Sequence, residues 1–451
     1  MALIELDLDA PPAPSPSRPP ARYFRNVGVF TCVLLVLALG GAAPAVAVLW
    51  QRAGLVPLAG PTTSYQLVGG LLYTLDGNAG LRTTTAWSLH PVRKLWTLST
   101  PLAVDSAGSV IQDGASLSAA GRYVLLHASD GTRVIDSRSG RIRWTSRSPL
   151  ASDNGGVGII QQTEFPPGTE YDQSSGDPGP LYWSEDGVPH TQPPDHTVLR
   201  GLDLGTGRVR WTVSERGSVY VVPALGDATG FVVIAADRLS WLATDTGAVL
   251  REQPLPRFAG SDISYPEPMG EVLILRHNVS DTGAGTATAF GMDTLEQRWQ
   301  VTEPAQDGGS GSCLGLPCEQ DGDRLAVLDP ATGVPLWYAS RQVTVLSHGH
   351  DALELRGTSK TPVRVLDART GRVKVDLSGW QTVTDASDRA PIVVYRAQAP
   401  TGRAGFGVLA PGASRVQLLG LSSQRVEQCA SDEKYVACRT GNGVEVWSFR
   451  T

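Results

Sequence analysis

The cysteines are the most reactive side chains of this 451-residue chain, and four of the five form two close pairs. Cys313 lies near Cys318, and Cys429 lies near Cys438. Because even, locally paired cysteines are typical of disulfides in an oxidising compartment, we expect two structural disulfides. Neither pair has the C-x-x-C spacing of a zinc or thioredoxin-like redox site, so we expect no metal or redox role for them.

Three further polar clusters could do chemistry. In the first, His348/His350/Asp351, two histidines could face one side of a strand. The second, Ser431–Lys434, has the S-x-x-K spacing of a nucleophile. The third, His190/His196 with Asp186 and Asp195, could ligate a metal. The first two are more typical of hairpin turns, and the chain lacks the G-x-S-x-G, H-E-x-x-H, phosphate-loop and EF-hand patterns. We therefore expect no catalytic residue, no cofactor and no metal.

Residues 27–50 form an apolar run without one charged side chain. At 1.5 Å rise per residue, a helix of this length can cross a hydrocarbon core of about 30 Å. Positive residues precede the run at Arg18, Arg22 and Arg25, which predicts a cytoplasmic N-terminus. We expect a disordered tail over 1–26, a transmembrane helix over 27–50 and a linker over 51–61.

A cleaved signal peptide is the alternative, because Ala45-Val46-Ala47 has the small-x-small pattern of a cleavage site. Either interpretation places the rest of the chain outside the cytoplasm, and the uncleaved anchor would hold it at the cell membrane. A net charge of −6 with interspersed signs argues against a nucleic-acid partner. Abundant Ala, Gly, Val and Arg with few Lys indicate a GC-rich, bacterial genome.

One phrase recurs along the rest of the chain. It is clearest at Val134–Trp144, Gly201–Trp211, Val327–Trp337 and Val365–Val375, where an apolar strand ends at Asp, Gly follows four residues later and Trp or Val four after that. Asp can bond turn amides, Gly supplies a positive φ, and Trp begins the next strand. Nine such positions, spaced 36–67 residues apart and separated by short alternating strands, predict an all-β chain with the period of propeller blades.

The D-x-x-T-G-x-x-x-W phrase resembles the tryptophan-docking repeat of pyrroloquinoline-quinone-type (PQQ-like) β-propellers over residues 62–451. The resemblance implies four-stranded blades, with eight favoured and seven or nine as alternatives, and an N-terminal strand that completes the last blade. It also implies that the Trp of one blade packs on the turn of its neighbour. Val375 and Leu418 depart from this pattern, and the matching residues are Trp96, Trp144, Trp211, Trp299 and Trp337.

The longest spacing contains an apparent insertion at 151–196, rich in Gly, Pro and acidic residues. Insertions in propellers map to one face, and aromatic side chains among polar ones are typical of partner contacts. The alternative is that these rings pack the loop onto the propeller rim. The candidate partner-binding residues are Phe165, Tyr171, Tyr182 and Trp183.

These observations predict a non-enzymatic, membrane-anchored propeller that binds or scaffolds another extracytoplasmic protein. Within the resembling family, the propeller subunit of the outer-membrane β-barrel assembly machinery is the nearest functional analogy, by fold alone. A sensor that binds a small molecule or cell-wall fragment at the central channel is the second hypothesis. A degenerate quinoprotein dehydrogenase is the third, although this chain lacks the adjacent cysteines of that class.

Overall fold

A computed structural model describes residues 49–450, with gaps at 79, 103–113, 155, 173, 175, 177–178, 186, 224–229, 256–262, 279–284, 304–311, 358–360, 384–390 and 399–401. Within these residues the chain consists of strands and turns, without an α-helix. No helix that could cross a membrane is found in this part of the chain. The predicted tail at 1–26 and most of the predicted span, residues 27–48, lie outside the described residues.

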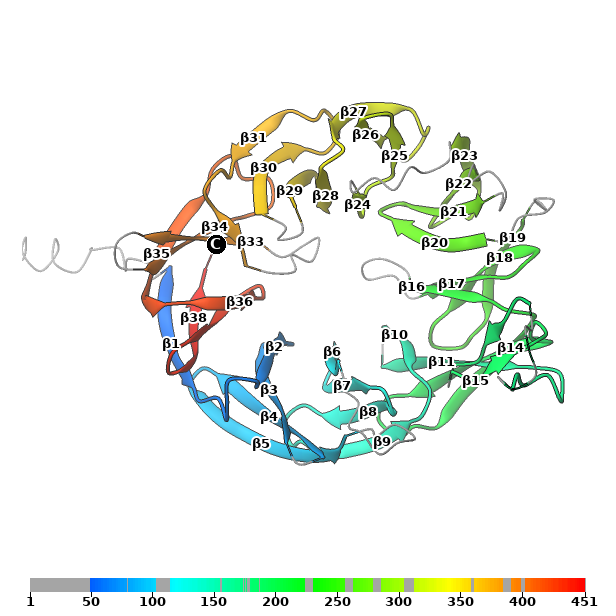
Figure 1. The fold of residues 1–451 in the computed structure, drawn as a ribbon, viewed down its shortest axis with the longest axis horizontal. Helices are drawn as coiled ribbons and strands as arrows, with labels where there is room; N and C mark the ends of the chain where they lie inside the picture. The colour runs from blue at the N-terminus through cyan, green and yellow to red at the C-terminus, as the bar shows by residue number, and fades with distance from the viewer. Residues whose placement is uncertain are drawn as a thin grey trace, which may run out of the picture. The chain divides into compact units, whose positions relative to one another are not determined.

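Nine consecutive sheets form the blades of a propeller (Figure 1). In blades 1 to 8 the strands are antiparallel and run outward in chain order, so the D-x-x-T-G turn or its degenerate equivalent joins the last two strands of each blade. Blade 1 contains β2 (Ser64–Val68), β3 (Leu71–Asn78), β4 (Leu81–Leu89) and β5 (Val92–Pro101). Blade 2 contains β6 (Ser116–Ala120), β7 (Tyr123–Ala128), β8 (Gly131–Asp136) and β9 (Ile142–Ser146). Blade 3 contains β10 (Leu150–Asn154), β11 (Val157–Glu164), β14 (His196–Asp203) and β15 (Val209–Arg216).

The middle of the ring repeats this plan with one irregularity. Blade 4 contains β16 (Tyr220–Pro223), β17 (Gly230–Ile234), β18 (Arg238–Ala243) and β19 (Val249–Pro254). Blade 5 contains β20 (Ile263–Met269), β21 (Val272–Asn278), β22 (Gly285–Gly291) and β23 (Gln297–Glu303). Blade 6 contains only β25 (Cys318–Asp321), β26 (Arg324–Leu328) and β27 (Pro335–Ser340) in its sheet, because β24 (Ser312–Leu314) pairs in parallel with the first strand of blade 7.

The last three blades complete the ring. Blade 7 contains β28 (Val343–His348), β29 (Asp351–Arg356), β30 (Thr361–Asp367) and β31 (Val373–Asp376). Blade 8 contains β32 (Gln381–Thr382), β33 (Ile392–Gln398), β34 (Arg403–Leu409) and β35 (Gln417–Arg425). Blade 9 contains β36 (Glu427–Ser431), β37 (Tyr435–Thr440), β38 (Gly443–Phe449) and, as its outer strand, β1 (Trp50–Val56). The favoured number of eight blades is therefore wrong, and the alternative of nine is confirmed.

The closing blade is built from both ends of the described chain. β1 pairs antiparallel with β38, from Trp50 opposite Phe449 to Val56 opposite Val444. This confirms that an N-terminal strand completes the last blade and removes an unpaired edge. It also corrects two boundaries, since the propeller begins at Trp50 rather than 62 and the predicted linker at 51–61 is largely strand. Trp50, the last residue of the predicted membrane span, stacks on Phe406 at 5.0 Å and on Trp447 at 5.4 Å between ring centroids.

Each of the five predicted docking tryptophans lies on the outer strand of one blade and contacts the turn of the next. The indole Nε1 donates to the carbonyl of the residue after the turn Asp or its equivalent, at 2.8–3.0 Å. The ring lies against the turn glycine, so that a Cβ there would be only 2.6–2.8 Å from it. These glycines have φ of 66–71°, a backbone that other residues rarely adopt. The pairs are Trp96/Gly140, Trp144/Gly207, Trp211/Gly247, Trp299/Gly333 and Trp337/Gly371.

The other four junctions keep the contact with different residues. Between blades 4 and 5, Arg251 takes the Trp position and donates to the carbonyl of Asp293, while Leu295 takes the Gly position at φ 59° with its side chain fully buried. Between blades 9 and 1 the large and small residues are exchanged: the glycine is Gly54 on the outer strand β1, and it packs against the larger Val92 at the turn of blade 1. Gly420 of blade 8 likewise receives the ring of Trp50. Between blades 7 and 8, Val375 and Trp380 share an apolar cluster with Leu409.

Candidate functional site

The D-x-x-T-G turns are held by their aspartates, as the spacing predicts. Asp136 Oδ1 accepts from the Ser139 amide at 3.0 Å, and Asp203 and Asp367 accept from the equivalent Thr206 and Thr370 amides at 2.8 and 2.9 Å. The Arg122 guanidinium bonded to Asp136 lowers the pKa of that carboxyl to about 2. These side chains stabilise the turns on which the tryptophans dock, which is a structural role.

The insertion is shorter than predicted. Residues 150–154 and 157–164 are β10 and β11, regular strands of blade 3, so the true insertion joins β11 to β14. It contains a small hairpin of β12 (Tyr182–Trp183) and β13 (Pro189–His190). The Thr163 amide donates to Glu185 at 3.0 Å and so connects the hairpin to β11.

The four candidate aromatic residues of the insertion divide into two pairs. Phe165 is half-buried and stacks on His190 at 3.8 Å, and Tyr171 donates its hydroxyl to the Gly176 carbonyl at 2.6 Å. Both therefore stabilise the loop, as the rim-packing alternative predicts. Tyr182 and Trp183 instead remain 38% and 62% exposed on the hairpin. Only this second pair is available to a partner without rearrangement.

Both predicted disulfides are present. Cys429–Cys438 joins directly opposite residues of β36 and β37 in the closing blade. Cys313–Cys318 joins β24 to β25, and so ties the strand that pairs with blade 7 back to its own blade. The first therefore joins two strands of one hairpin. The second links two sheets rather than two strands of one hairpin.

The structure does not bring the remaining candidate residues together as a metal site, and no cluster of three potential ligands occurs within the described residues. His190 bonds Thr169 at 3.0 Å, and His196 lies 3.0 Å from Glu164. Asp186 lies outside the described residues and Asp195 is exposed. Asp432 accepts from the Lys434 and Tyr435 amides, so the Ser431–Lys434 segment is the expected turn.

The His348–Asp351 segment differs from expectation, because only its centre is a solvated turn. His348 and Asp351 face each other across the β28–β29 hairpin, and both are buried. Asp351 pairs with Lys374 at 2.5 Å and accepts from the Gly412 amide of blade 8 at 3.1 Å. Asp351 therefore supports the junction between blades 7 and 8, where a docking tryptophan is missing.

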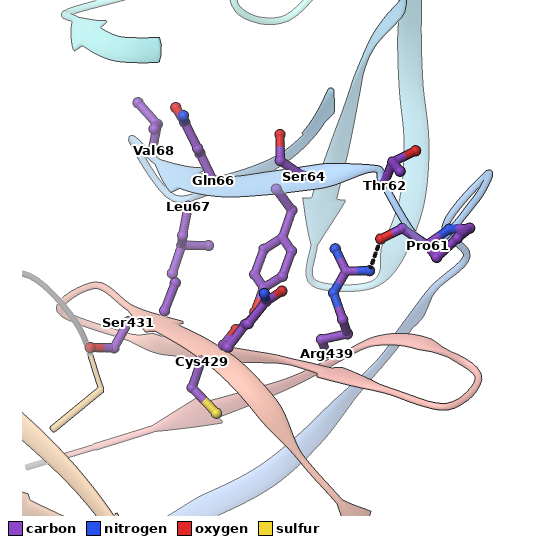
Figure 2. Close-up of a pocket in the computed structure, with 12 residues that line it drawn as sticks. Pro61, Thr62, Ser64, Gln66, Leu67, Val68, Cys429, Ser431 and Arg439 are labelled. Carbon is purple, nitrogen blue, oxygen red and sulfur yellow. Dashed lines mark hydrogen bonds between the residues drawn. The ribbon is translucent and has the colours of Figure 1, made fainter. Parts of the chain in front are cut away.

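A cavity of about 720 Å³ lies at the junction of blades 9 and 1 (Figure 2). Residues 61–68, with β2, form one wall, and residues 428–431 of β36 with Arg439 of β37 form the other. Leu67 points toward β36, whereas Gln66 and Val68 point away from it. The Gln66 side chain forms hydrogen bonds with the backbone of Ala115 and of Leu117 in β6 of blade 2, so the wall is connected to the neighbouring blade on its other side.

Two contacts join the walls of this cavity. The Tyr65 hydroxyl donates to the Gln428 carbonyl, and burial raises the pKa of Tyr65. Gln428 has a φ of 45°, in the left-handed region, which places backbone strain on the cavity wall. Arg439 donates to the carbonyls of Pro61, at 2.9 Å, and Thr63.

The lining combines hydroxyls, amides and short apolar side chains with one charged group, Arg439. Such a lining can bind a small polar ligand by hydrogen bonds. The sequence analysis did not find this site, because its residues come from both ends of the propeller and from strands without a motif.

The comparisons with known proteins agree with the repeat. A family model described as outer membrane protein assembly factor BamB matches residues 195–316. The PQQ-like β-propeller repeat predicted from the sequence is thereby confirmed. No curated protein matches the chain in sequence.

Solved propellers resemble the chain at low identity. BamB from Moraxella catarrhalis is 15% identical, with 89% of this chain and 100% of that chain covered and a TM-score of 0.36. A eukaryotic initiation factor is 10% identical, with 81% and 91% covered and a TM-score of 0.42. The Dos1 propeller is 11% identical, with 88% and 95% covered and a TM-score of 0.39. Likeness at this level carries no information on activity or partners.

Proposed function

We propose that this chain is a non-enzymatic, membrane-anchored β-propeller that binds another extracytoplasmic protein. The exposed pair Tyr182 and Trp183 carries the proposal. Aromatic side chains at an interface supply large contact areas at low conformational cost, and Trp and Tyr are enriched among binding hot spots. The fold of the BamB-like repeat is consistent with a protein-binding platform.

The placement of this pair supports a binding role over a purely structural one. Phe165 and Tyr171 hold the loop, and the Thr163–Glu185 contact connects the hairpin to β11. Trp183 contributes little to this packing because its side chain lies largely in solvent, and Tyr182 beside it is 38% exposed. A partner would therefore meet two aromatic side chains on a hairpin that is already connected to β11.

The extracytoplasmic location is supported by two independent features. Two disulfides fit an oxidising compartment. The uncharged run from residue 27 is long enough for a membrane anchor, with arginines on its N-terminal side.

Photo-crosslinking in the native membrane tests the binding proposal. A benzophenone amino acid replaces Trp183 in the full chain, and a matched chain carries it at Tyr338, which is also exposed but lies on β27 of blade 6. We expect one discrete adduct from position 183 and none from position 338. Equal labelling at both positions, or none at 183, would contradict the proposal.

The cavity between blades 9 and 1 favours a second candidate function, a sensor of a small polar molecule or cell-wall fragment. Binding there would bridge β2 and β36 and so stabilise the point where the ring closes. Thermal unfolding of the full chain with added soluble wall fragments tests this function. The midpoint should rise for the wild type and not for Tyr65→Phe or Arg439→Gln, and an unchanged wild-type midpoint would count against it.

A further inference from the structure

The turns between the third and fourth strands of the blades all lie on one face of the propeller, because the third strands run in the same direction in every blade. We call this the turn face. Its eight segments are 88–95, 136–143, 203–210, 243–250, 291–298, 329–336, 367–374 and 408–418. β1 also begins on this face, since Trp50 pairs with Phe449 at the end of the third strand of blade 9.

The net charge of these eight segments is opposite in sign to the charge of the whole chain. The eight segments contain twelve Lys or Arg and seven Asp or Glu, in a chain whose formal net charge is −6. The positive side chains are also unevenly distributed. Blades 7, 8, 1, 2 and 3, which with blade 9 form a continuous arc, contain eleven of the twelve and only three acids. We call this the basic arc; blades 4, 5 and 6 form the acidic arc, with one Arg and four acids.

Most cations of the basic arc have no carboxylate partner among the described residues. Arg210 pairs with Asp203, and Lys374 pairs with Asp351. The three acids of the arc are the turn aspartates, which accept backbone amides. The cations without such a partner are exposed, and they are Arg93, Lys94, Arg138, Arg141, Arg143, Arg208, Arg369, Arg372 and Arg415.

Apolar side chains are exposed on the same segments. Four belong to the basic arc, each 41–63% exposed at or next to the start of an outer strand: Ile142, Val209, Val373 and Leu418. Exposed aliphatic side chains among unpaired cations are the combination by which a protein surface binds an anionic lipid layer. Binding of nucleic acid by charge would require the cations alone, without aliphatic side chains beside them.

We propose that the basic arc of the turn face rests on an anionic lipid surface. The position of blade 9 supports this occupant, because blade 9 lies at the centre of the basic arc and its strand β1 begins at Trp50, the last residue of the apolar run. The proposal rests on the membrane anchor proposed above. It deepens that function, since a propeller held by this face would leave its opposite face open to partners.

Fluorescence of the full chain in lipid vesicles tests the proposal. In a Cys32→Ala background, Val209→Cys carries an environment-sensitive nitrobenzoxadiazole probe, and Val334→Cys on the acidic arc carries the same probe as a matched control. We expect lipids with a nitroxide near the headgroup to quench the probe at 209 in vesicles containing phosphatidylglycerol, and to leave the probe at 334 unquenched. Replacing Arg138, Arg141, Arg208 and Arg372 with Gln should abolish the quenching at 209.

The outcomes separate this inference from the anchor. A chain that fails to float with the vesicles contradicts the anchor, and the inference is then overturned with it. A chain that floats while the probe at 209 stays unquenched, or is quenched equally at 334, overturns the lipid-binding face and leaves the anchor standing. Quenching that is equal in phosphatidylcholine alone, or that competing nucleic acid or acidic peptide abolishes, overturns the assignment to anionic lipid.

Discussion

Five junctions of the ring contain a tryptophan on a glycine turn, and four achieve the same contact without that pair. At the five, a large ring fills the space that a turn without a Cβ leaves open. At the junction of blades 4 and 5 the turn residue is Leu295, and its buried side chain fills the space that no indole occupies. Between blades 9 and 1 the small residue is Gly54 on the strand and the larger one is Val92 on the turn.

The difference shows that each junction keeps the combined volume of the two facing side chains, whereas the residue type on either blade can vary. Interiors are packed at the density of organic crystals, so volume lost on one side must be recovered on the other. The tryptophan adds a directional bond to a turn carbonyl, which Arg251 alone among the four substitutes reproduces with a side-chain donor. The substituted junctions are therefore expected to be less stabilising.

Removal of a docking tryptophan should have the largest effect. Trp211→Ala empties a buried junction and leaves the Thr244 carbonyl without its donor. We expect the free energy of unfolding to fall by about 3–5 kcal/mol. Arg251→Ala, at the substituted junction, should lower it by only about 1 kcal/mol. Chemical unfolding of the full chain in detergent, followed by circular dichroism, measures both.

Trp183→Ala is the matched control for the loss of an indole. Its side chain is mostly in solvent, so its stability change should stay within about 0.5 kcal/mol. Equal losses for Trp211→Ala and Arg251→Ala would mean that the two kinds of junction are equivalent.

Exchange of the pair at a substituted junction should give an intermediate effect. Leu295→Gly removes a buried side chain but relieves a positive φ, and we expect a net loss of about 2 kcal/mol in the free energy of unfolding. Adding Arg251→Trp should recover most of this loss, because the indole can then occupy the vacated volume. A double variant no more stable than the single one would contradict the shared-volume interpretation.

Neither junction of the closing blade has a tryptophan docked on a glycine turn, so the disulfide of this blade should matter. Cys429→Ser with Cys438→Ser should lower the free energy of unfolding by about 2–3 kcal/mol, by the loop-closure argument for a short loop. The disulfide between Cys313 and Cys318 closes a shorter loop, so the same pair of changes there should lower the free energy of unfolding somewhat less. Unfolding midpoints of the two double variants, measured with the wild type, provide the test.

Acid should weaken the turns by the smallest amount. The pKa of Asp136 is about 2, below its usual value of about 3.9, so its stabilising contribution is complete above pH 4 and is lost as the pH falls toward 2. Asp136→Asn should flatten this part of the stability–pH curve. Asp245→Asn, an exposed turn residue of blade 4, serves as the control and should leave it unchanged.

The residues of the repeat could be predicted from the sequence, whereas the residues that replace the tryptophan–glycine pair at the other junctions could not. Asp203, Gly207 and Trp211 stand at fixed spacing, so the blade period and both sides of the Trp junctions could be predicted from the sequence. Arg251 and Leu295 are meaningful only as a pair from two different blades. Because the closing blade has no turn after β38, its repeat is interrupted by the chain ends, and the blade count was one too low.

The predicted starts of the propeller and of the insertion are wrong for a related reason. Trp50 follows an apolar run, so its hydrophobicity indicates a membrane interface as readily as a core, and only its stacking on Phe406 and Trp447 distinguishes the two. β10 begins in a polar, Gly-rich stretch and was interpreted as part of the insertion. Pairing partners distant in the sequence decide such cases, and local composition does not record them.

The closing blade has a consequence for biogenesis. β1 is among the first parts of the propeller to be synthesised, yet its partner β38 is the last. Until β38 has been synthesised, β1 therefore keeps an open edge that could pair with a strand of another molecule. Ring formation is bound to be slow, because its final step joins segments separated by nearly the whole chain. A premature stop codon within the last strand would leave the first strand unpaired as well, although that strand had been translated correctly.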